Sequence, residues 1–326
     1  MPLFHKLLSL PLCFAALSCW AQAPAGHGQH PPSAQISGPA AELVVPWPPG
    51  GGTDSVARAF AQLATPFAQQ PPAVVNRPGA SGAIGFQYAL TPSPNNKLAM
   101  VSAEILLLPL QGIGQVQLGQ FEPIAQLTND PLAITVRADA PWQSIEEWLA
   151  SAQSTPGLTI STAGVGTTHH MAVTSLAHAT GAQLINVPYQ GTAPAVMGVL
   201  SGEVHATIAA YAELAHFVEA GKLRTLAVLA KERLPAIAQV PTLRERGHDL
   251  QWSVWRGLAL PKGSAPELVQ AWQDVAHRIA TSPQFASTLK GLSITPAYLD
   301  RKAFSARLQA EEQAYRALLP HLKQSQ

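Results

Sequence analysis

Cysteine is almost absent from this sequence of 326 residues, which contains two, Cys13 and Cys19. Both fall within the first 21 residues, a segment that we expect to be removed. The mature chain would then have no disulfide, no thiolate nucleophile and no cysteine-ligated metal. A chain of this length can fold without disulfides, because it can bury a sizeable hydrophobic core.

Charge is also scarce, since 12% of the residues are Asp, Glu, Lys or Arg, about half of the usual share. The formal net charge is +1, and Lys and Arg nowhere form a run longer than two. Because a row of phosphates needs clustered basic side chains, the composition argues against nucleic-acid binding. The hydrophobic fraction of 47% excludes an intrinsically disordered chain, since it supplies enough apolar surface to offset the entropy of folding.

The apolar stretch that most resembles a membrane-spanning segment is short. It covers residues 7–17, follows Lys6 and precedes the small residue Ala21, which is the order found in secretory signal peptides. A helix needs roughly 20 apolar residues to cross a membrane. We therefore predict that residues 1–21 are a signal peptide, cleaved after Ala21, and that the protein is exported. In an alternative interpretation an acylated Cys19 anchors the protein to a membrane as a lipoprotein.

Residues 22–40 contain mainly Pro, Gly, Gln, His and Ser, which predicts a flexible tether, so the fold is expected to begin near Ala41. Beyond it, short apolar runs typical of buried strands alternate with helical patterns. The expected strands are 43–45, 73–75, 98–101, 134–136, 158–161, 184–187, 205–209 and 223–229. The expected helices are 56–68, 144–152, 170–180, 193–200, 212–220 and 267–281. This alternation predicts an α/β fold with mainly parallel sheets, and the length predicts two lobes.

A glycine-rich turn connects the first expected strand to its helix. It contains Gly50, Gly51 and Gly52 and ends in Thr53 and Asp54. Glycines let the backbone approach a ligand closely, and the free N–H groups at a helix start attract anions. The turn lacks the Gly-Lys-Ser/Thr ending of a phosphate-binding P-loop and the spacing of a dinucleotide-binding motif. It is typical of a site for a carboxylate or another small anion, although a tight turn without a ligand has the same composition.

A second turn of this design contains Gly166 and continues through Thr167, Thr168 and His169 into a helix. Its hydroxyl, imidazole and N–H groups could bind a ligand, or one threonine could simply cap the helix. The adjacent pair His169 and His170 does not indicate a metal site, because neighbouring helical residues point to different faces. We expect no metal.

A third turn follows the expected strand 184–187 and contains Tyr189 and Gly191 before the next helix. Tyr189 offers an aromatic face and a hydroxyl to a ligand. The same residue type is common as a half-buried packing residue, so both interpretations stay open.

Ordered motifs are distributed along the chain after the tether. They are 44–54, 75–82, 161–169, 187–194, 220–228, 240–243 and 255–259. In order and approximate spacing they resemble the motifs of the Bug-type periplasmic solute-binding proteins of tripartite tricarboxylate transporters. The resemblance covers the whole mature chain after the tether.

This resemblance implies a two-lobed, type II periplasmic-binding-protein-like fold. Each lobe would be a mainly parallel sheet flanked by helices, with a two-strand hinge near 134–137 and 254–260. The first lobe is expected to comprise 41–131 and 256–326, and the second lobe 132–255. The resemblance also implies a periplasmic monomer that uses no cofactor.

The family binds its solute between the glycine-rich turn of one lobe and two turns of the other. The positions carried over are Gly51, Gly52, Thr53, Asp54, Gly166, Thr167, Thr168, His169, Tyr189 and Gly191. Glu104 departs from the pattern of the family and is a further candidate. In the cleft its carboxylate would repel a dianion and could hold an ammonium group, and its alternative position is in solvent. The expected ligand is thus a carboxylate, an amino acid or a nicotinamide-like molecule.

The function implied is capture of a small organic acid or related metabolite for uptake by a membrane permease of the tripartite tricarboxylate type. One alternative is a ligand-loaded partner of a sensor-kinase ectodomain. Another is a periplasmic enzyme, but the chain has no Gly-x-Ser-x-Gly motif and no mature cysteine to support catalysis.

Overall fold

The computed structural model describes residue 36 and residues 39–93, 96–154 and 156–323, without the side chains of 321–323. These residues belong to one compact unit. The predicted signal peptide 1–21, including Cys13 and Cys19, lies outside the described residues. Within the described ranges, every helix falls short of the length or the apolarity that a membrane crossing requires.

Part of the predicted tether is packed against the fold. Ile36 is buried, and its N–H donates to the carbonyl of Phe67 at 2.9 Å. The N–H of Gln69 in turn donates to the carbonyl of Ile36 at 3.2 Å, so that Ile36 pairs in parallel with Ala68. The packed part of the chain therefore begins before Ala41.

The described strands form one mixed sheet in the order β2-β1-β3-β9-β4-β7-β5-β6, with β8 and β10 also paired to β4. Their bounds are β1 Glu42–Val45, β2 Ala73–Asn76, β3 Lys97–Val101, β4 Phe121–Arg137, β5 Leu158–Thr162, β6 Leu184–Pro188, β7 Ala206–Ala210, β8 Leu223–Val228, β9 Ser253–Pro261 and β10 Pro296–Leu299. Pairing is parallel among β1, β2 and β3 and among β5, β6 and β7. Every pair that involves β4 or β9 is antiparallel.

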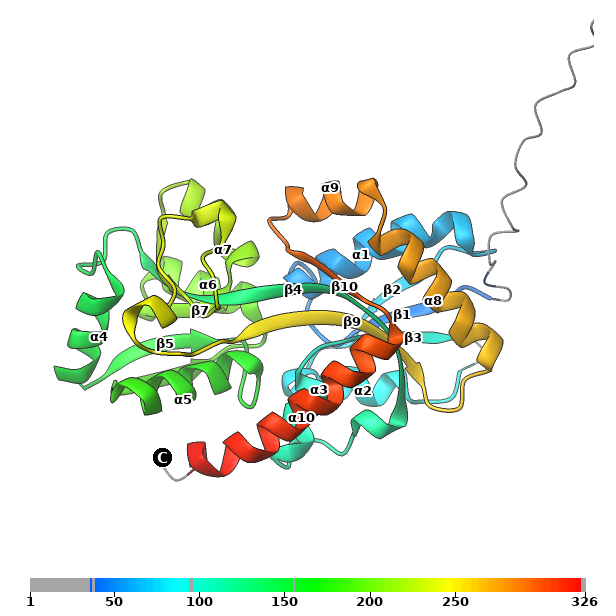
Figure 1. Cartoon of the computed structure of the whole chain (residues 1–326), viewed down its shortest axis with the longest axis horizontal. Helices are drawn as coiled ribbons and strands as arrows, with labels where there is room; N and C mark the ends of the chain where they lie inside the picture. Colours follow the sequence, from blue (N-terminus) through cyan, green and yellow to red (C-terminus); the bar gives the residue numbers. More distant parts are fainter. Residues whose placement is uncertain (1–35, 37–38, 94–95, 155, 324–326) are drawn as a thin grey trace, which may run out of the picture. The chain divides into compact units, whose positions relative to one another are not determined.

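The strands form two groups that β4 connects (Figure 1). Up to Pro131, β4 pairs with β9, and from Leu132 onward it pairs with β7 and β8. We call the β1, β2, β3, β9 and β10 group with the first half of β4 the first lobe, and the β5 to β8 group with the second half of β4 the second lobe. The two-lobed α/β fold is thus confirmed, while the predicted residue bounds of the lobes stay a prediction.

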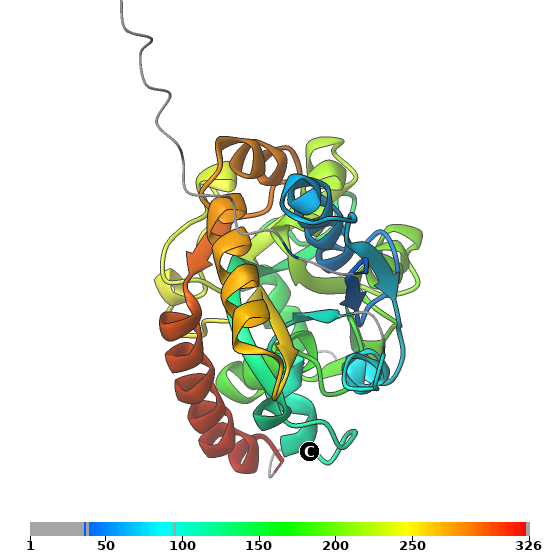
Figure 2. The same ribbon diagram turned by 90° about the vertical axis from the view of Figure 1, so that its right-hand side faces the viewer.

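Helices cover both faces of the first lobe, as Figures 1 and 2 show from two sides. The helices are α1 Gly52–Ala64, α2 Ala83–Ala89, α3 Glu104–Leu110, α4 Ile145–Ser154, α5 Thr168–Thr180, α6 Thr192–Ser201, α7 Tyr211–Glu219, α8 Pro266–Ala280, α9 Pro283–Gly291 and α10 Arg301–Lys323. Because strand side chains alternate between faces, Leu43 and Val45 pack with α1, α8 and α9, whereas Val44 packs with α2 and α3. Both faces of β1 are therefore buried, which explains its continuous apolar sequence.

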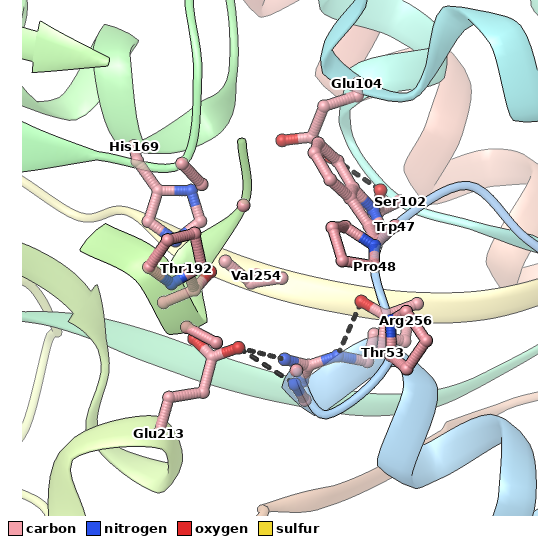
Figure 3. A pocket seen from close by; sticks show the side chains of 17 residues that line it. Trp47, Pro48, Thr53, Ser102, Glu104, His169, Thr192, Glu213, Val254 and Arg256 are labelled. Carbon is pink, nitrogen blue, oxygen red and sulfur yellow. Dashed lines mark hydrogen bonds and ion pairs between the residues drawn. The ribbon is translucent and has the colours of Figure 1, made fainter. Parts of the chain in front are cut away.

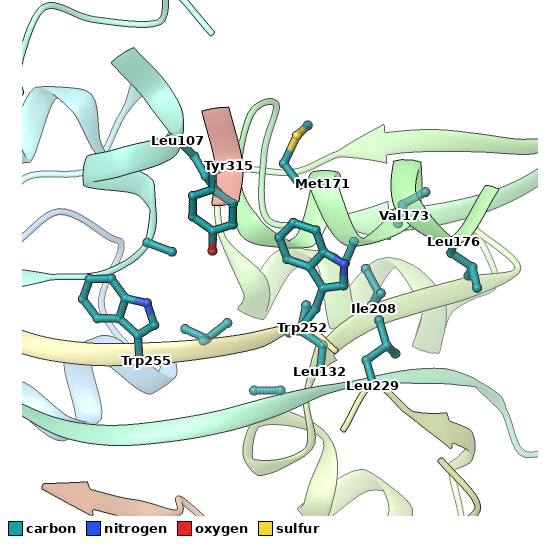
Figure 4. Close-up of a cluster of buried hydrophobic side chains, with 14 of the residues drawn as sticks. Leu107, Leu132, Met171, Val173, Leu176, Ile208, Leu229, Trp252, Trp255 and Tyr315 are labelled. Carbon is teal, nitrogen blue, oxygen red and sulfur yellow. The ribbon is translucent and has the colours of Figure 1, made fainter. Parts of the chain in front are cut away.

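A hydrophobic cluster joins the two lobes (Figure 4). Trp252 stacks on Tyr315 of α10 with ring centroids 5.9 Å apart, and Met171 of α5 and Leu107 of α3 belong to the same cluster. Leu132, at the point where β4 changes partners, is fully buried in it. Residues from both lobes therefore contribute to this one cluster.

The sequence patterns did not predict the elements whose apolar residues lack a clear helical or strand spacing. The first half of β4 contains Pro123 and Pro131 and polar residues between them, so it does not look like a buried strand, although it pairs with β9 through two irregularities. The run at α3 is apolar throughout and includes Pro109, which hides its helical character. The antiparallel β4 and β9 also make the sheet more mixed than the mainly parallel sheets that we expected, because these strands connect the lobes rather than belonging to βαβ units.

Candidate functional site

A cavity lies where strand β9 meets the starts of helices from both lobes (Figure 3). Its lining includes residues at the starts of α1, α3, α5 and α6, together with Glu213 of α7 and Arg256 of β9. The complete lining is Trp47, Pro48, Pro49, Gly51, Gly52, Thr53, Ser102, Glu104, Ala163, His169, Gly191, Thr192, Ala193, Pro194, Glu213, Val254 and Arg256. The volume that the centre of a water-sized sphere can occupy inside the cavity is about 40 Å³. A water needs roughly 10–15 Å³ by this measure, so the cavity suits a small solute.

Asp54 holds the glycine-rich turn in shape. Its carboxylate accepts hydrogen bonds from the N–H of Gly50 at 3.0 Å, from Nε of Arg58 at 2.8 Å and from Nδ2 of Asn76 at 2.9 Å. Burial by itself would raise the pKa of Asp54, but these hydrogen bonds and the Arg58 charge lower it. Gly50 has a φ of +88°, which favours glycine. Asp54 thus supports the turn and does not line the cavity.

Gly52 allows two charged side chains to approach the start of α1. A Cβ atom at Gly52 would lie 2.3 Å from Nη2 of Arg256 and 3.0 Å from Oε1 of Glu213. The N–H of Gly52 donates to Oε1 of Glu213 at 3.0 Å. Only a residue without a side chain fits between the helix start and these groups.

Arg256 is a buried cation on the floor of the cavity, with 1% of its surface exposed. Its Nη1 donates to Asp130 at 2.5 Å and its Nε donates to the hydroxyl of Thr53 at 3.3 Å. Its Nη2 lies 3.8 Å from Oε1 of Glu213. Burial raises the pKa of Asp130, and the Arg256 charge acts in the opposite direction. The guanidinium is therefore already surrounded by two acidic side chains.

Glu104 lines the cavity but uses both of its oxygens in hydrogen bonds within the protein. Its Oε1 accepts from the N–H and the hydroxyl of Thr168 at 2.9 and 2.8 Å, and its Oε2 accepts from Ser102 at 2.5 Å. A carboxylate at a helix start is favourable because it meets free N–H groups and the positive end of the helix dipole. Glu104 of the first lobe thus caps α5 of the second lobe.

His169 is the least satisfied polar group in the cavity. It is 5% exposed, and neither ring nitrogen has a hydrogen-bond partner in the part of the chain that the structure describes. Burial lowers its pKa, and the charges of Glu213 and Glu104 offset this only in part. The imidazole is neutral at pH 7, with one donor and one acceptor available.

The remaining predicted site residues of the second lobe lie outside the cavity lining. Thr167 caps α5, since its hydroxyl oxygen accepts from the N–H of His170. Gly166 donates its N–H to Nδ1 of His170 and accepts from Gln111 of the first lobe at 2.9 Å. Tyr189 packs on Gly198 of α6, where a Cβ atom would lie 2.4 Å from its hydroxyl.

The structure brings Gly51, Gly52, Thr53, Glu104, His169 and Gly191 together around the cavity. Asp54, Gly166, Thr167, Thr168 and Tyr189 support the surrounding turns and helices instead. Whether these residues bind a ligand stays a prediction.

Sequence reasoning missed Arg256 and Glu213, the charged residues nearest to Gly52. An arginine inside the apolar segment 254–260 is a usable signal, because a charge in a buried strand needs a partner or a role. Glu213 gives no such signal, since a glutamate on a short amphipathic helix normally faces solvent.

The model of the "Tripartite tricarboxylate transporter family receptor" family matches residues 56–322. A protein of Cupriavidus necator, described as a UPF0065 protein in the gbd 5' region, is 30% identical over 266 residues, which are 81% of each chain. The crystal structure of a TctC solute-binding protein from Polaromonas is 37% identical, covers 90% of this chain and 100% of that one, and superimposes with a TM-score of 0.67. The periplasmic binding protein BugD is 26% identical, with 88% and 99% of the two chains covered and a TM-score of 0.81.

Two Rhodopseudomonas palustris structures, one with adipate and one with malate, share the fold at 23% and 24% identity, with TM-scores of 0.82 and 0.77. They cover 88% and 86% of this chain, and 99% of each of those chains is covered. The family model matches most of the chain, and the two lobes of this protein have the arrangement expected for the family. This protein therefore belongs to the Bug-type receptor family of tripartite tricarboxylate transporters.

Proposed function

We propose that this protein is an exported receptor that holds a small organic acid, or a related metabolite, in the cavity between its lobes. The observation that carries the proposal is the convergence of helix starts from both lobes on one cavity with a buried arginine. Helix starts supply N–H donors without a side-chain charge, which suits a polar solute that must later be released. Relatives solved with adipate or malate give the carboxylate class its support.

The hydrogen bonds in the cavity support a role in binding rather than in catalysis. Ser102 donates to Glu104, and both ring nitrogens of His169 lack a hydrogen-bond partner, so no hydroxyl of the described cavity residues is hydrogen-bonded to this imidazole. In the proposed function the solute leaves unchanged and passes to the permease of a tripartite transporter. If the ligand-loaded protein captured a sensor-kinase ectodomain instead of a permease, the same binding site would serve signalling rather than uptake.

The proposed location is the periplasm, and the support is the signal-peptide pattern at 1–21 together with the periplasmic relative. Mass spectrometry of the exported protein should give Gln22 as the first residue. A lipid-modified Cys19 at the amino terminus would contradict release into the periplasm.

Thermal unfolding of the mature protein in a panel of dicarboxylates, tricarboxylates, aromatic acids, amino acids and nicotinamides tests the function. A solute at 100 times its Kd adds about 2.7 kcal/mol, and each kcal/mol raises the Tm by about 2–4 °C. We expect one class to raise the Tm by several degrees and to be recovered chemically unchanged by NMR. No shift with any class, or steady consumption of the bound compound, would contradict the proposal.

A further inference from the structure

We propose that the solute of this receptor carries a protonated amino group, held by Glu213, and a carboxylate, held at the start of α6. This inference rests on the proposed function and specifies the solute as a small zwitterion. It separates this chain from a receptor for dicarboxylates.

Two of the helix starts are already occupied by carboxylates of the protein itself. Glu213 of the second lobe accepts from Gly52 at the start of α1, and Glu104 of the first lobe accepts from Thr168 at the start of α5. Each carboxylate reaches across to the other lobe. A dicarboxylate would have to displace both of these tethered anions in order to use the same N–H groups.

The charges around the cavity also disfavour a dianion. Arg256 is paired with Asp130 at 2.5 Å and lies 3.8 Å from Glu213. Glu104 has no cation among its hydrogen-bond partners, which are Thr168 and Ser102. The lining thus carries more negative than positive charge, so a second pair of carboxylates would meet repulsion in a buried site, where charges are less screened.

One carboxylate of the cavity lining has an oxygen without a donor. Oε2 of Glu213 is buried and has no hydrogen-bond partner among the described residues, and the Glu213 side chain as a whole is 12% exposed. An unpaired buried carboxylate oxygen is costly, and an ammonium group would supply the missing donor and a cation that Glu213 need not share with Asp130. His169, which is also buried and unpaired, lies in the same lining and can orient a second N–H of the solute (Figure 3).

The start of α6 remains for the carboxylate of the solute. Gly191, Thr192 and Ala193 line the cavity there, and the first N–H groups of a helix have no partner within it. Pro194 has no N–H, so Thr192 and Ala193 provide the donor pair, and the Thr192 hydroxyl adds a third donor. In contrast to α1 and α5, no side-chain carboxylate caps this helix among the described residues.

Isothermal titration calorimetry with matched triads of probes tests the inference. Each triad comprises an amino acid, the acid that lacks its amino group and the amine that lacks its carboxylate, for example alanine, propionate and ethylamine. Malate and adipate serve as the dicarboxylates. We expect the amino acid of at least one triad to bind at least about tenfold more tightly than its two fragments and than either dicarboxylate.

Two variants separate the ends of the solute. Glu213→Gln keeps an oxygen for Gly52 and replaces the unpaired acceptor with an N–H donor. It should therefore weaken amino-acid binding about tenfold or more and reduce the ratio between the affinities for the amino acid and for the acid that lacks its amino group. Glu219→Gln, at an exposed position of the same helix, is the matched control and should change nothing. Thr192→Pro removes both the N–H and the hydroxyl donor of Thr192 at a position where helices accept proline, and it should weaken binding of the acid and the amino acid but not binding of the amine.

Tight binding of malate or adipate with weak binding of every amino acid would overturn this inference and leave the receptor function intact. Unchanged selectivity in the folded Glu213→Gln protein would also overturn it. If no probe of any class binds, both the inference and the proposed function are contradicted.

Discussion

Arg256 shows how one residue combines stability with recognition. It lies in β9 between apolar neighbours, and its guanidinium contacts Asp130 in the first lobe and approaches Glu213 in the second. A buried ion pair contributes little net stability, but loss of one partner leaves a charge without compensation. The position therefore tolerates few substitutions.

Replacement of Arg256 by Met should destabilise the protein by about 3–5 kcal/mol, because Asp130 stays buried without its cation. Urea unfolding measures this change. The double replacement Arg256→Met with Asp130→Asn should recover most of the loss, and Arg316→Met, at an exposed ion pair with Glu312, should cost less than about 1 kcal/mol. An equally small effect of Arg256→Met would refute the assigned role of the pair.

His169 makes the stability depend on pH. Burial lowers its pKa, so the unfolded chain takes up a proton below about pH 6.5 while the folded protein takes it up only at lower pH. Above the unfolded pKa the neutral His169 does not reduce the free energy of unfolding. As the pH falls below the unfolded pKa toward the folded pKa, the free energy of unfolding drops by about 1.4 kcal/mol for each pH unit. His170, whose pKa burial also lowers, acts in the same direction.

Denaturant unfolding of wild type and His169→Leu between pH 7.5 and 5.5 checks this sign. The variant should lose less stability over this range than the wild type, whereas His216→Gln, at an exposed position, should behave as the wild type. If the free energy of unfolding of His169→Leu fell more steeply with decreasing pH than that of the wild type, the imidazole would be protonated in the folded protein.

At the residue scale the sequence was informative where a residue departs from an expected type. Glu104 is a candidate from the sequence because the resemblance leads one to expect a different residue there, and its side chain lines the cavity. Its partner Thr168 could not be predicted, since contacts between lobes depend on how the lobes close. Glu213 was missed because the helix pattern of α7 says which face is buried and not which polar residue of the other face meets another lobe.

At the scale of the elements, four strand-to-helix junctions build the site. The sequence predicts three of these junctions well, because glycine and a capping residue after a short apolar run are local signals. The junction from β3 to α3 lacks both signals, since Ser102 and Ala103 lead directly into Glu104. Local chemistry therefore predicts the turns better than it predicts their relative positions.

Gly52→Val tests the start of α1. The new side chain would meet Arg256 and Glu213, so solute binding should weaken by at least about tenfold and the Tm should fall. Titration calorimetry and thermal unfolding measure these effects. Gly119→Val, where a Cβ atom meets no atom within 4 Å, is the control, and equal affinity in both variants would exclude the α1 start from the site.

Glu104→Gln tests the cap of α5. A neutral side chain retains one acceptor for Thr168 but loses the charge that favours the helix start, so unfolding should become easier by about 1–2 kcal/mol. Urea unfolding gives this value. Higher stability in the variant would mean that the Glu104 charge is a burden in the empty protein, as expected of a residue kept for its ligand.

At the scale of the whole molecule, β4 and β9 connect two lobes that also share a core around Trp252 and Tyr315. The two-lobed arrangement follows from the resemblance and from chain length, not from strand periodicity, because the prolines in β4 obscure the connecting strand. The C-terminal α10, which reaches from one lobe toward the other, has a largely polar sequence that gave no signal of this role. Long-range packing of this kind is set by many weak contacts, and no single motif encodes it.

A crystal structure of the mature protein with the solute that raises its Tm most would test the proposed binding site directly. We expect the solute in the cavity between the lobes, within hydrogen-bond distance of Thr192 and Glu213 and close to Gly52. A solute bound at any other place, with this cavity filled only by side chains or water, would contradict it.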